Sequence, residues 1–197
     1  MIKRFSAAYL STIMSACVPH YIPPPTLQAS AVEINTPEIA NEWLKNVLTY
    51  RSDMLLYGKS DFWASCTLTY QNRAGDCEDF SICAAVLLEG DIEKGYFVLM
   101  YNPLSNKKDE EKGIKGHAVF AYKSGGRWGV ISNQGREFRT PLFASLEYVV
   151  QDINDIKLPE ERYTQYYVID YDGADLLSYG GDLNSRMKTV GEGHIRP

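Results

Sequence analysis

The chain of 197 residues has few cysteines and few histidines, which limits the sites it can form. Its four cysteines, Cys17, Cys66, Cys77 and Cys83, show neither a Cys-x-x-Cys pair nor a zinc-ligand spacing. Cys77 and Cys83 are six positions apart in one predicted helix, so their side chains do not face each other. We therefore expect no metal centre built on cysteine and no framework of disulfides.

The chain also lacks a basic stripe and an internal repeat. Its formal net charge is −5, which argues against a nucleic-acid partner. Hydrophobic residues make up 45% of the chain and charged residues 23%, as in ordinary globular proteins. The length suits one domain with a substantial core and flanking segments.

The first 18 residues have the pattern of a secretory signal. Two basic residues precede a short apolar run and a group of small residues, and the run is too short to span a bilayer. The segment Met14–Cys17 resembles a bacterial lipobox, which would make Cys17 the lipidated first residue of the mature chain. A buried N-terminal helix of a cytosolic protein is the alternative. Residues 19–30 are Pro-rich and fit a stiff linker.

Residues 31–170 are predicted to form one domain, and residues 171–197 a polar, Gly-rich tail without fixed structure. Residues 51–60 have the composition of a turn, and residues 104–113 that of a charged surface loop. Helices are expected near 36–50, 60–63, 77–88 and 145–153, and strands near 95–101, 114–122, 128–133 and 163–170.

One stretch of this domain combines a thiol with a helix start. Gly75 and Asp76 precede Cys77, and the helix that follows is apolar on every face, which indicates a buried helix. The helix dipole lowers the pKa of a cysteine at this end. Asp76 is a favourable N-cap, and Asp79 would close a reciprocal cap. Both acids oppose the thiolate, so a nucleophilic Cys77 needs a nearby cation such as an imidazolium.

His117 is the histidine available to supply that imidazolium, since His20 and His194 lie in the linker and the tail. It begins a strand that a glycine turn joins to the next strand. With a three-residue loop, 124–126, Asn133 lies opposite His117; with a two-residue or four-residue loop, Gln134 does. The first register predicts a Cys77-His117-Asn133 arrangement typical of thiol hydrolases.

An oxyanion site would complete this chemistry. The backbone N–H of Cys77 lies in the first helical turn and is free to donate, and Gln71 and Trp63 are candidates for the second donor. Each residue also has an ordinary structural interpretation: a core cysteine, a core histidine, a turn asparagine and a polar loop glutamine. Their combination favours catalysis.

The motifs resemble the transglutaminase-like superfamily, and within it the bacterial transglutaminase-like cysteine proteinases. The resemblance rests on the segments 75–80 (Gly-Asp-Cys-Glu-Asp-Phe), 116–119 (Gly-His-Ala-Val) and 130–133 (Val-Ile-Ser-Asn), with 61–63 (Asp-Phe-Trp) upstream. It implies an α+β, papain-like fold in which the cysteine helix packs on an antiparallel sheet.

The resemblance also implies Cys77 as nucleophile and His117 as general base. The third member of the family's triad is usually an aspartate, which is absent from the matching stretch 131–133 (Ile-Ser-Asn). Either Asn133 orients His117, or Ser132 stands in the aspartate position. Some relatives bind calcium near the active site, and Glu78 and Asp79 lie in that neighbourhood, although capping and solvation are the preferred explanation of these acids.

Together these observations predict a cysteine-dependent hydrolase that cleaves amide or peptide bonds through a Cys77 thioester. The expected substrate is a protein or peptide, and the expected location is secreted or periplasmic, with membrane contact only through a lipid anchor. No organic cofactor is indicated. Two alternatives are an inactive domain with a binding or assembly role at the envelope, and a peptidoglycan amidase or endopeptidase acting on cell-wall peptides.

Overall fold

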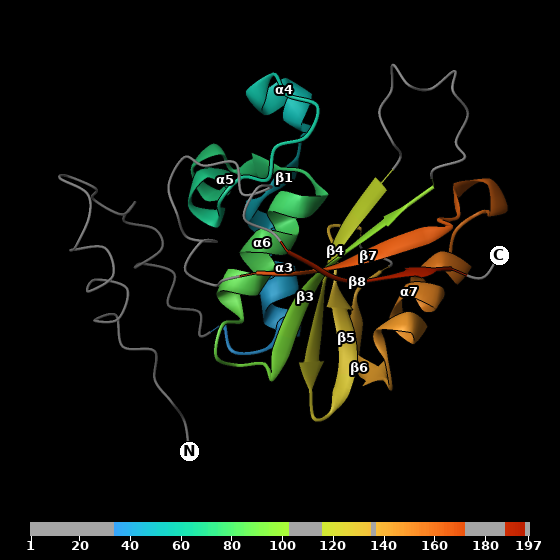
Figure 1. Ribbon diagram of the computed structural model, residues 1–197. Coiled ribbons are helices and arrows are strands. Elements are labelled where there is room, and N and C mark those ends of the chain that lie inside the picture. Colours follow the sequence, from blue (N-terminus) through green and yellow to red (C-terminus); the bar gives the residue numbers. More distant parts are fainter. Residues whose placement is uncertain (1–33, 103–115, 135–136, 172–187, 196–197) are drawn as a thin grey trace. The chain divides into compact units, whose positions relative to one another are not determined.

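The computed structural model describes residues 34–102, 116–134, 137–171 and 188–195 (Figure 1). The chain divides into two compact units, Met1–Ile34 and Asn35–Pro197, and only the second is described beyond a single residue. The predicted signal with Cys17, the linker and the loop 104–113 therefore lie outside the described residues. Within these ranges, no helix is long and apolar enough to cross a membrane.

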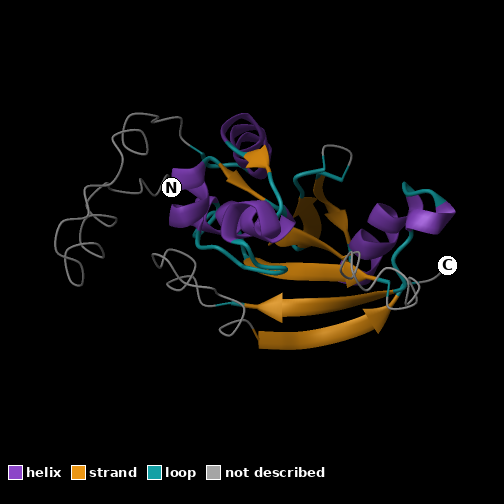
Figure 2. Cartoon of the chain, turned by 90° about the horizontal axis from the view of Figure 1, so that it is seen from above, coloured by secondary structure: helices purple, strands orange, loops and turns teal. Residues whose placement is uncertain are grey.

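The second unit is built on a six-stranded sheet in the order β6-β5-β4-β3-β7-β8. Every neighbouring pair is antiparallel, and Figure 2 shows adjacent strands pointing in opposite directions. The predicted α+β class is confirmed. The strands are β3 (Lys94–Tyr101), β4 (Gly116–Ser124), β5 (Arg127–Ile131), β6 (Arg139–Phe143), β7 (Gln165–Asp170) and β8 (Lys188–His194).

Two helices cover opposite faces of this sheet (Figure 1). Helix α7 (Leu146–Asp155) packs on the face that carries Val98, Val119 and Val130. Helix α6 (Cys77–Leu87) lies on the other side and contacts β4 and β3. Residues of β4 alternate between the two faces, so His117 shares the α7 face with Val119, whereas Ala118 points toward α6.

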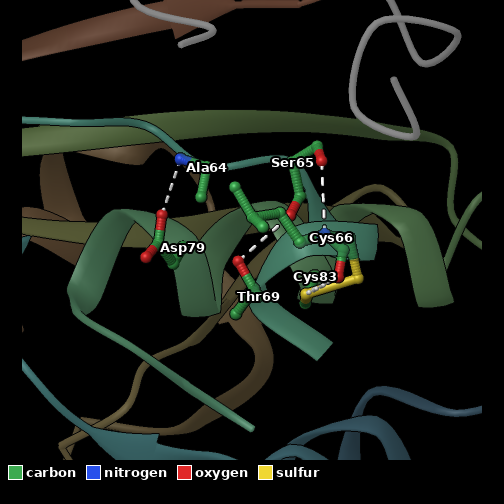
Figure 3. The surroundings of a disulfide bond; sticks show 7 residues. Ala64, Ser65, Cys66, Thr69, Asp79 and Cys83 are labelled. Carbon is green, nitrogen blue, oxygen red and sulfur yellow. Dashed lines mark hydrogen bonds between the residues drawn. A yellow bond between two sulfur atoms is a disulfide. The ribbon is translucent and has the colours of Figure 1, made fainter. Parts of the chain in front are cut away.

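Helix α6 is buried along most of its length, as its apolar sequence predicts. A disulfide between Cys66 and Cys83 joins it to α5 (Cys66–Asn72), with 4.7 Å between the two Cα atoms (Figure 3). The sequence led us to expect no framework of disulfides, and this single bond departs from that expectation. The apolar helix offers no periodicity that would show which face Cys83 presents to a neighbour.

The segments that precede α6 are short. Helix α3 (Pro37–Val47) begins as predicted, with Thr36 Oγ1 accepting the Ile39 N–H. Residues 51–60, predicted as a turn, contain α4 (Asp53–Tyr57), and the helix expected at 60–63 instead begins at Cys66. Strand β1 (Thr49–Tyr50) pairs in parallel with β2 (Ala74–Gly75), which places Tyr50 beside the residues that lead into Cys77.

The β4–β5 hairpin has a two-residue loop. Ser124 pairs with Arg127, and Gly125 and Gly126 have φ angles of 58° and 75°, which a type I′ turn requires at both positions. The three-residue loop that would set Asn133 opposite His117 was wrong, and the two-residue register, which points to Gln134, is correct.

The C-terminal part departs from the predicted tail. Strand β8 lies within residues 171–197 and pairs with β7 at the edge of the sheet. Edge strand β6 and the short 3₁₀ helix η2 (Pro159–Glu161) were also not predicted. Glycines and polar residues in β8 suit an edge strand with one exposed face, which is why their composition resembles that of a loop.

Candidate active site

Cys77 is the first residue of α6 and follows β2 directly. It is the free cysteine of the described ranges. Its Sγ lies 2.9 Å from Glu78 Oε2, to which the thiol donates, and the backbone N–H of Ala118 points at the sulfur. Because Ala118 directly follows His117, the thiol lies at the start of β4, beside the imidazole.

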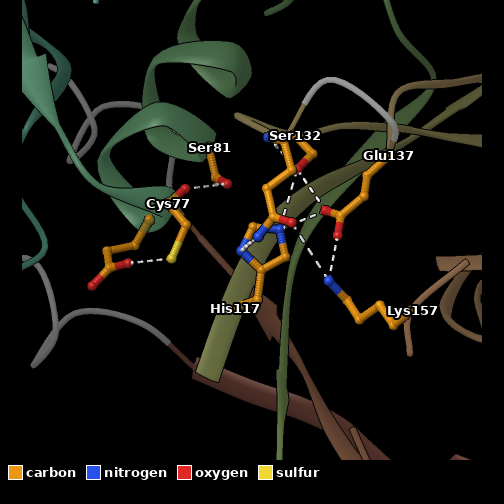
Figure 4. A network of polar contacts seen from close by, with 8 residues as sticks. Cys77, Ser81, His117, Ser132, Glu137 and Lys157 are labelled. Atoms are coloured by element: carbon orange, nitrogen blue, oxygen red, sulfur yellow. Dashed lines mark hydrogen bonds and ion pairs between the residues drawn. The ribbon is translucent and has the colours of Figure 1, made fainter. Parts of the chain in front are cut away.

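His117 belongs to a buried network on the α7 side of the sheet (Figure 4). Its Nε2 lies 2.6 Å from Glu137 Oε2 and 3.1 Å from Ser132 Oγ. The Ser132 hydroxyl donates to the same Glu137 oxygen over 2.7 Å. Lys157 Nζ donates to the other carboxylate oxygen, Oε1, at 2.8 Å. The Glu137 side chain is 1% exposed, so four side chains from separate parts of the chain fix one another.

This network keeps the Glu137 carboxylate ionised. Burial raises the pKa of Glu137, but the hydrogen bond and charge of His117, together with Lys157 and Ser132, outweigh it and lower the pKa to about 2. An ionised carboxylate only accepts hydrogen bonds, so His117 carries a proton on Nε2. In the neutral ring, Nδ1 is then the basic nitrogen.

Cys77 and His117 line the same pocket, of about 330 Å³, with Tyr50, Gly116, Asn133 and Gln134. Figure 4 shows Cys77 on one side of the imidazole and Glu137 on the other. The amide Nε2 of Gln134 lies 3.5 Å from His117 Nδ1, which marks the pocket side of the ring. The two residues predicted to share the chemistry are thus brought together.

The third predicted member, Asn133, also lines the pocket, but its Oδ1 is buried without a hydrogen-bond partner in the described part of the chain, so this oxygen does not orient His117. Ser132, the predicted alternative, does contact His117. The acidic partner, Glu137, was missed because it lies beyond the strand, where pairing arithmetic gives no positions. The signal available in the sequence was an acidic residue shortly after the hairpin.

The structure brings neither oxyanion candidate to the pocket lining. Trp63 is 4% exposed and packs edge-on against Phe97, with 5.9 Å between ring centroids. Gln71 is an exposed residue of α5. The backbone N–H of Cys77 lies in the first turn of α6, where helical pairing leaves it available to an oxyanion.

Carboxyl groups, most of them buried, surround the start of α6. Oxygen atoms of Asp53, Asp76 and Asp79 lie within 4.8 Å of one another, and those of Asp53, Asp61 and Glu78 form a second such group. Asp79 is fully buried, and its Oδ1 accepts the Ala64 N–H at 2.8 Å (Figure 3). The Asp76 backbone N–H also donates to the Asp79 carboxylate, as the predicted reciprocal cap requires, whereas the Asp76 side chain makes no cap bond.

These carboxyl groups fit a hard cation. Asp76 Oδ1 and Asp79 Oδ2 are buried and accept no hydrogen bond from the described residues. Burial, followed by neighbouring carboxyl groups, raises the pKa of Asp76 and of Asp79 to about 8, and burial raises that of Glu78 to about 7. Carboxylate oxygens at this spacing are the ligands that calcium prefers, and a divalent cation would remove the cost of their charge.

The same acids keep the thiol protonated. Burial and then the Glu78 carboxylate raise the pKa of Cys77 well above its ordinary value, and the Ala118 N–H only partly opposes them. Of the two acids expected to oppose the thiolate, Asp76 does so, and Glu78 has a larger effect than Asp76. A nucleophilic Cys77 therefore requires additional positive charge nearby.

No protein-family model and no curated protein sequence matches the chain. Among solved structures, it is similar to Legionella pneumophila LapG, with a TM-score of 0.40 and 13% identity over 72% of this chain and 66% of that one. The EGTA-treated form of LapG matches with a TM-score of 0.39 and 15% identity over 68% and 62%. The chain thus spans less than two thirds of the EGTA-treated LapG chain. At these low scores, the similarity establishes neither a common fold nor a common activity.

Proposed function

We propose that the chain is a cysteine-dependent hydrolase of the transglutaminase-like type, which cleaves amide bonds in proteins or peptides. The observation that carries this proposal is the shared pocket of Cys77 and His117, with Glu137 holding the far nitrogen of the ring. A cysteine helix packed on an antiparallel sheet supports the papain-like arrangement.

The reaction begins when His117 Nδ1 takes the proton of the Cys77 thiol. The thiolate attacks the carbonyl carbon of the substrate, and the Cys77 N–H donates to the oxyanion that forms. The tetrahedral intermediate collapses as the imidazolium protonates the leaving amine, which leaves a thioester on Cys77. Water then attacks the thioester, Nδ1 takes its proton, and this proton returns to the sulfur as the carboxylic acid leaves. Glu137 stays ionised and stabilises the imidazolium.

We further propose that calcium is the cofactor of this site. Asp53, Asp76 and Asp79 would hold the ion, since oxygen atoms of the three side chains converge. Two of the carboxylate oxygens, Asp76 Oδ1 and Asp79 Oδ2, have no hydrogen-bond partner in the described ranges. The ion would supply positive charge beside Cys77, where two neighbouring acids otherwise oppose the thiolate.

The disulfide supports a location outside the cytoplasm. Disulfides persist in oxidising compartments and are rare in the reducing cytosol, and Cys66 and Cys83 are bonded here. This agrees with the predicted signal and with lipidation at Cys17. We therefore propose a secreted or envelope-anchored enzyme whose substrates are polypeptides or cell-wall peptides.

One observation favours a second function. The thiol donates to Glu78, and its pKa is raised, as expected if the domain has kept the motif but serves in binding or assembly. The two functions differ in one property, the reactivity of Cys77 when a cation is supplied.

Alkylation by iodoacetamide tests this property, with peptide mass spectrometry reading Cys77 separately from Cys17. Rates are compared in wild type and His117→Ala, with calcium and with EDTA, between pH 6 and 9. A hydrolase is expected to react well below the ordinary thiol pKa of about 8.5 in calcium, and to lose this reactivity in His117→Ala. Equal and slow alkylation in all four samples would overturn the hydrolase and leave the binding domain. Synthetic peptides and cell-wall fragments, offered to a reactive enzyme, then separate the substrate classes.

A further inference from the structure

A largely buried lysine lies behind the imidazole, outside the pocket. Lys157 follows Ile156, the C-cap of α7, and its side chain is 11% exposed. Its Nζ lies 2.8 Å from Glu137 Oε1, 3.5 Å from Gln134 Oε1 and 5.0 Å from the centroid of the Tyr163 ring. Lysines are rarely buried this deeply unless they are paired, so its partner identifies its role.

Lys157 and His117 contact different oxygens of the Glu137 carboxylate. Oε2 is used by the His117 ring and the Ser132 hydroxyl, whereas Oε1 accepts from Lys157. A neutral imidazole brings no charge to offset the burial of the carboxylate, but the ammonium does. Lys157 therefore offers Glu137 a positively charged partner both when His117 is neutral and when it is protonated.

The position of the carboxylate also depends on Lys157. The segment between Ser132 and Glu137 is short, and the Glu137 backbone N–H is held by the Gln134 carbonyl at 2.9 Å. The Lys157 contact comes from a different element and fixes the carboxylate from the far side. His117 and Ser132 contact Oε2, and Lys157 adds the contact to Oε1 that fixes the rotation of the carboxylate from its other oxygen.

We propose that Lys157 is a positioning residue for His117: it holds Glu137 ionised and oriented, so that the ring keeps its proton on Nε2 and presents the Nδ1 lone pair to Cys77. The catalytic consequence rests on the proposed hydrolase function. The effect on the ring does not, because it follows from the contacts of Glu137 alone.

A purely structural ion pair would differ in one respect. If Lys157 only anchored the end of α7, its removal would lower stability and leave the imidazole unchanged. If it positions the ring, its removal also redistributes the proton between Nδ1 and Nε2. The position of that proton is therefore the decisive readout.

The experiment is long-range ¹H–¹⁵N NMR of the imidazole nitrogens in full-length Cys77→Ala protein, which cannot form a thiolate. The His117 signals are identified by their absence from the spectrum of the His117→Gln variant. In the parent and in Lys157→Arg, a proton on Nε2 is expected. In Lys157→Met, the signals are expected to move toward a mixture of the two tautomers. Lys188→Met, which changes an exposed lysine on β8, is the matched control and should behave as the parent.

A Lys157→Met spectrum that matches the parent, in a protein with native circular dichroism, would overturn the proposal. If Lys157→Met does not fold, Lys157→Gln is read instead, because its amide donates to Glu137 without charge. With Cys77 present, alkylation of the Met variant should be roughly 10- to 100-fold slower than wild type, with recovery in Lys157→Arg. If wild-type Cys77 proves inert, the hydrolase proposal fails, and the NMR result still decides the role of Lys157.

Discussion

Replacing Glu137 with glutamine tests the network behind His117 most directly. The substitution keeps the shape of the side chain but removes the charge that faces His117 Nε2 at 2.6 Å and Lys157 Nζ at 2.8 Å. The pKa of Glu137 falls from an ordinary 4.5 to about 2 in the folded protein. Since a tenfold change in proton affinity corresponds to ~1.4 kcal/mol, the ionised form contributes about 3 kcal/mol to the free energy of unfolding.

The dependence on pH follows from the direction of this shift. The folded pKa lies below the unfolded one, so the contribution is complete above about pH 4.5 and is lost as the pH falls through about 2. At pH 7, Glu137→Gln should therefore cost about 3 kcal/mol, and the difference from wild type should shrink steadily below pH 4.5. Breaking a buried ion pair has a cost of similar size, about 3 to 5 kcal/mol.

Urea unfolding, followed by tryptophan fluorescence at pH 7 and pH 3, measures this difference. Glu42→Gln, at an exposed position of α3, is the isosteric control and should match wild type at both values. Activity or Cys77 alkylation at pH 7 should fall by roughly 10- to 100-fold in Glu137→Gln. A stability difference that does not change between pH 7 and pH 3 would refute the assignment of the low pKa to Glu137.

Two further predictions concern the other side of the site. Calcium should raise the melting temperature more at pH 8 than at pH 5, because Asp76, Asp79 and Glu78 have folded pKa values of about 8, 8 and 7, above their ordinary values. The stability that these groups contribute when protonated is thus lost as the pH rises through these values. Thermal unfolding scans with and without calcium at the two pH values measure the difference. An equal calcium-induced rise in the melting temperature of Asp79→Asn would contradict the proposed calcium site. Reduction of Cys66–Cys83, which closes a loop of 17 residues, should lower the free energy of unfolding by about 3 kcal/mol. A Cys66→Ser/Cys83→Ser variant should be insensitive to dithiothreitol, and unchanged stability on reduction would argue against the disulfide.

The sequence predicted the two residues whose signals are local. Cys77 follows a glycine turn and opens an apolar helix, and His117 begins an apolar strand, so each was placed by its neighbours in the chain. Strand alternation then set His117 on a definite face. The structure brings both residues to the lining of one pocket, so local signals led to the pair at the centre of the candidate site.

The partner of His117 could not be found in the same way. Two adjacent glycines allow either a two-residue or a three-residue loop, and one residue of difference moves every partner along the ladder. Glu137 comes from the loop after β5, and Lys157 from beyond α7, so neither has a sequence period that leads to His117. The disulfide was missed for a related reason, since Cys83 lies on a helix that is apolar on every face.

The two sides of the site differ in how their charges are balanced. Behind His117, Glu137 is paired with Lys157, so the carboxylate can serve the ring without any external ion. Beside Cys77, the raised pKa values of Asp76 and Asp79 have burial and other carboxyl groups as their main causes, and the thiol shares this environment. A cation bound there should therefore change the reactivity of Cys77 without changing the tautomer of His117. Substitutions of Glu137 and Lys157 should act on the ring whether or not calcium is present, so the two halves of the site can be tested independently.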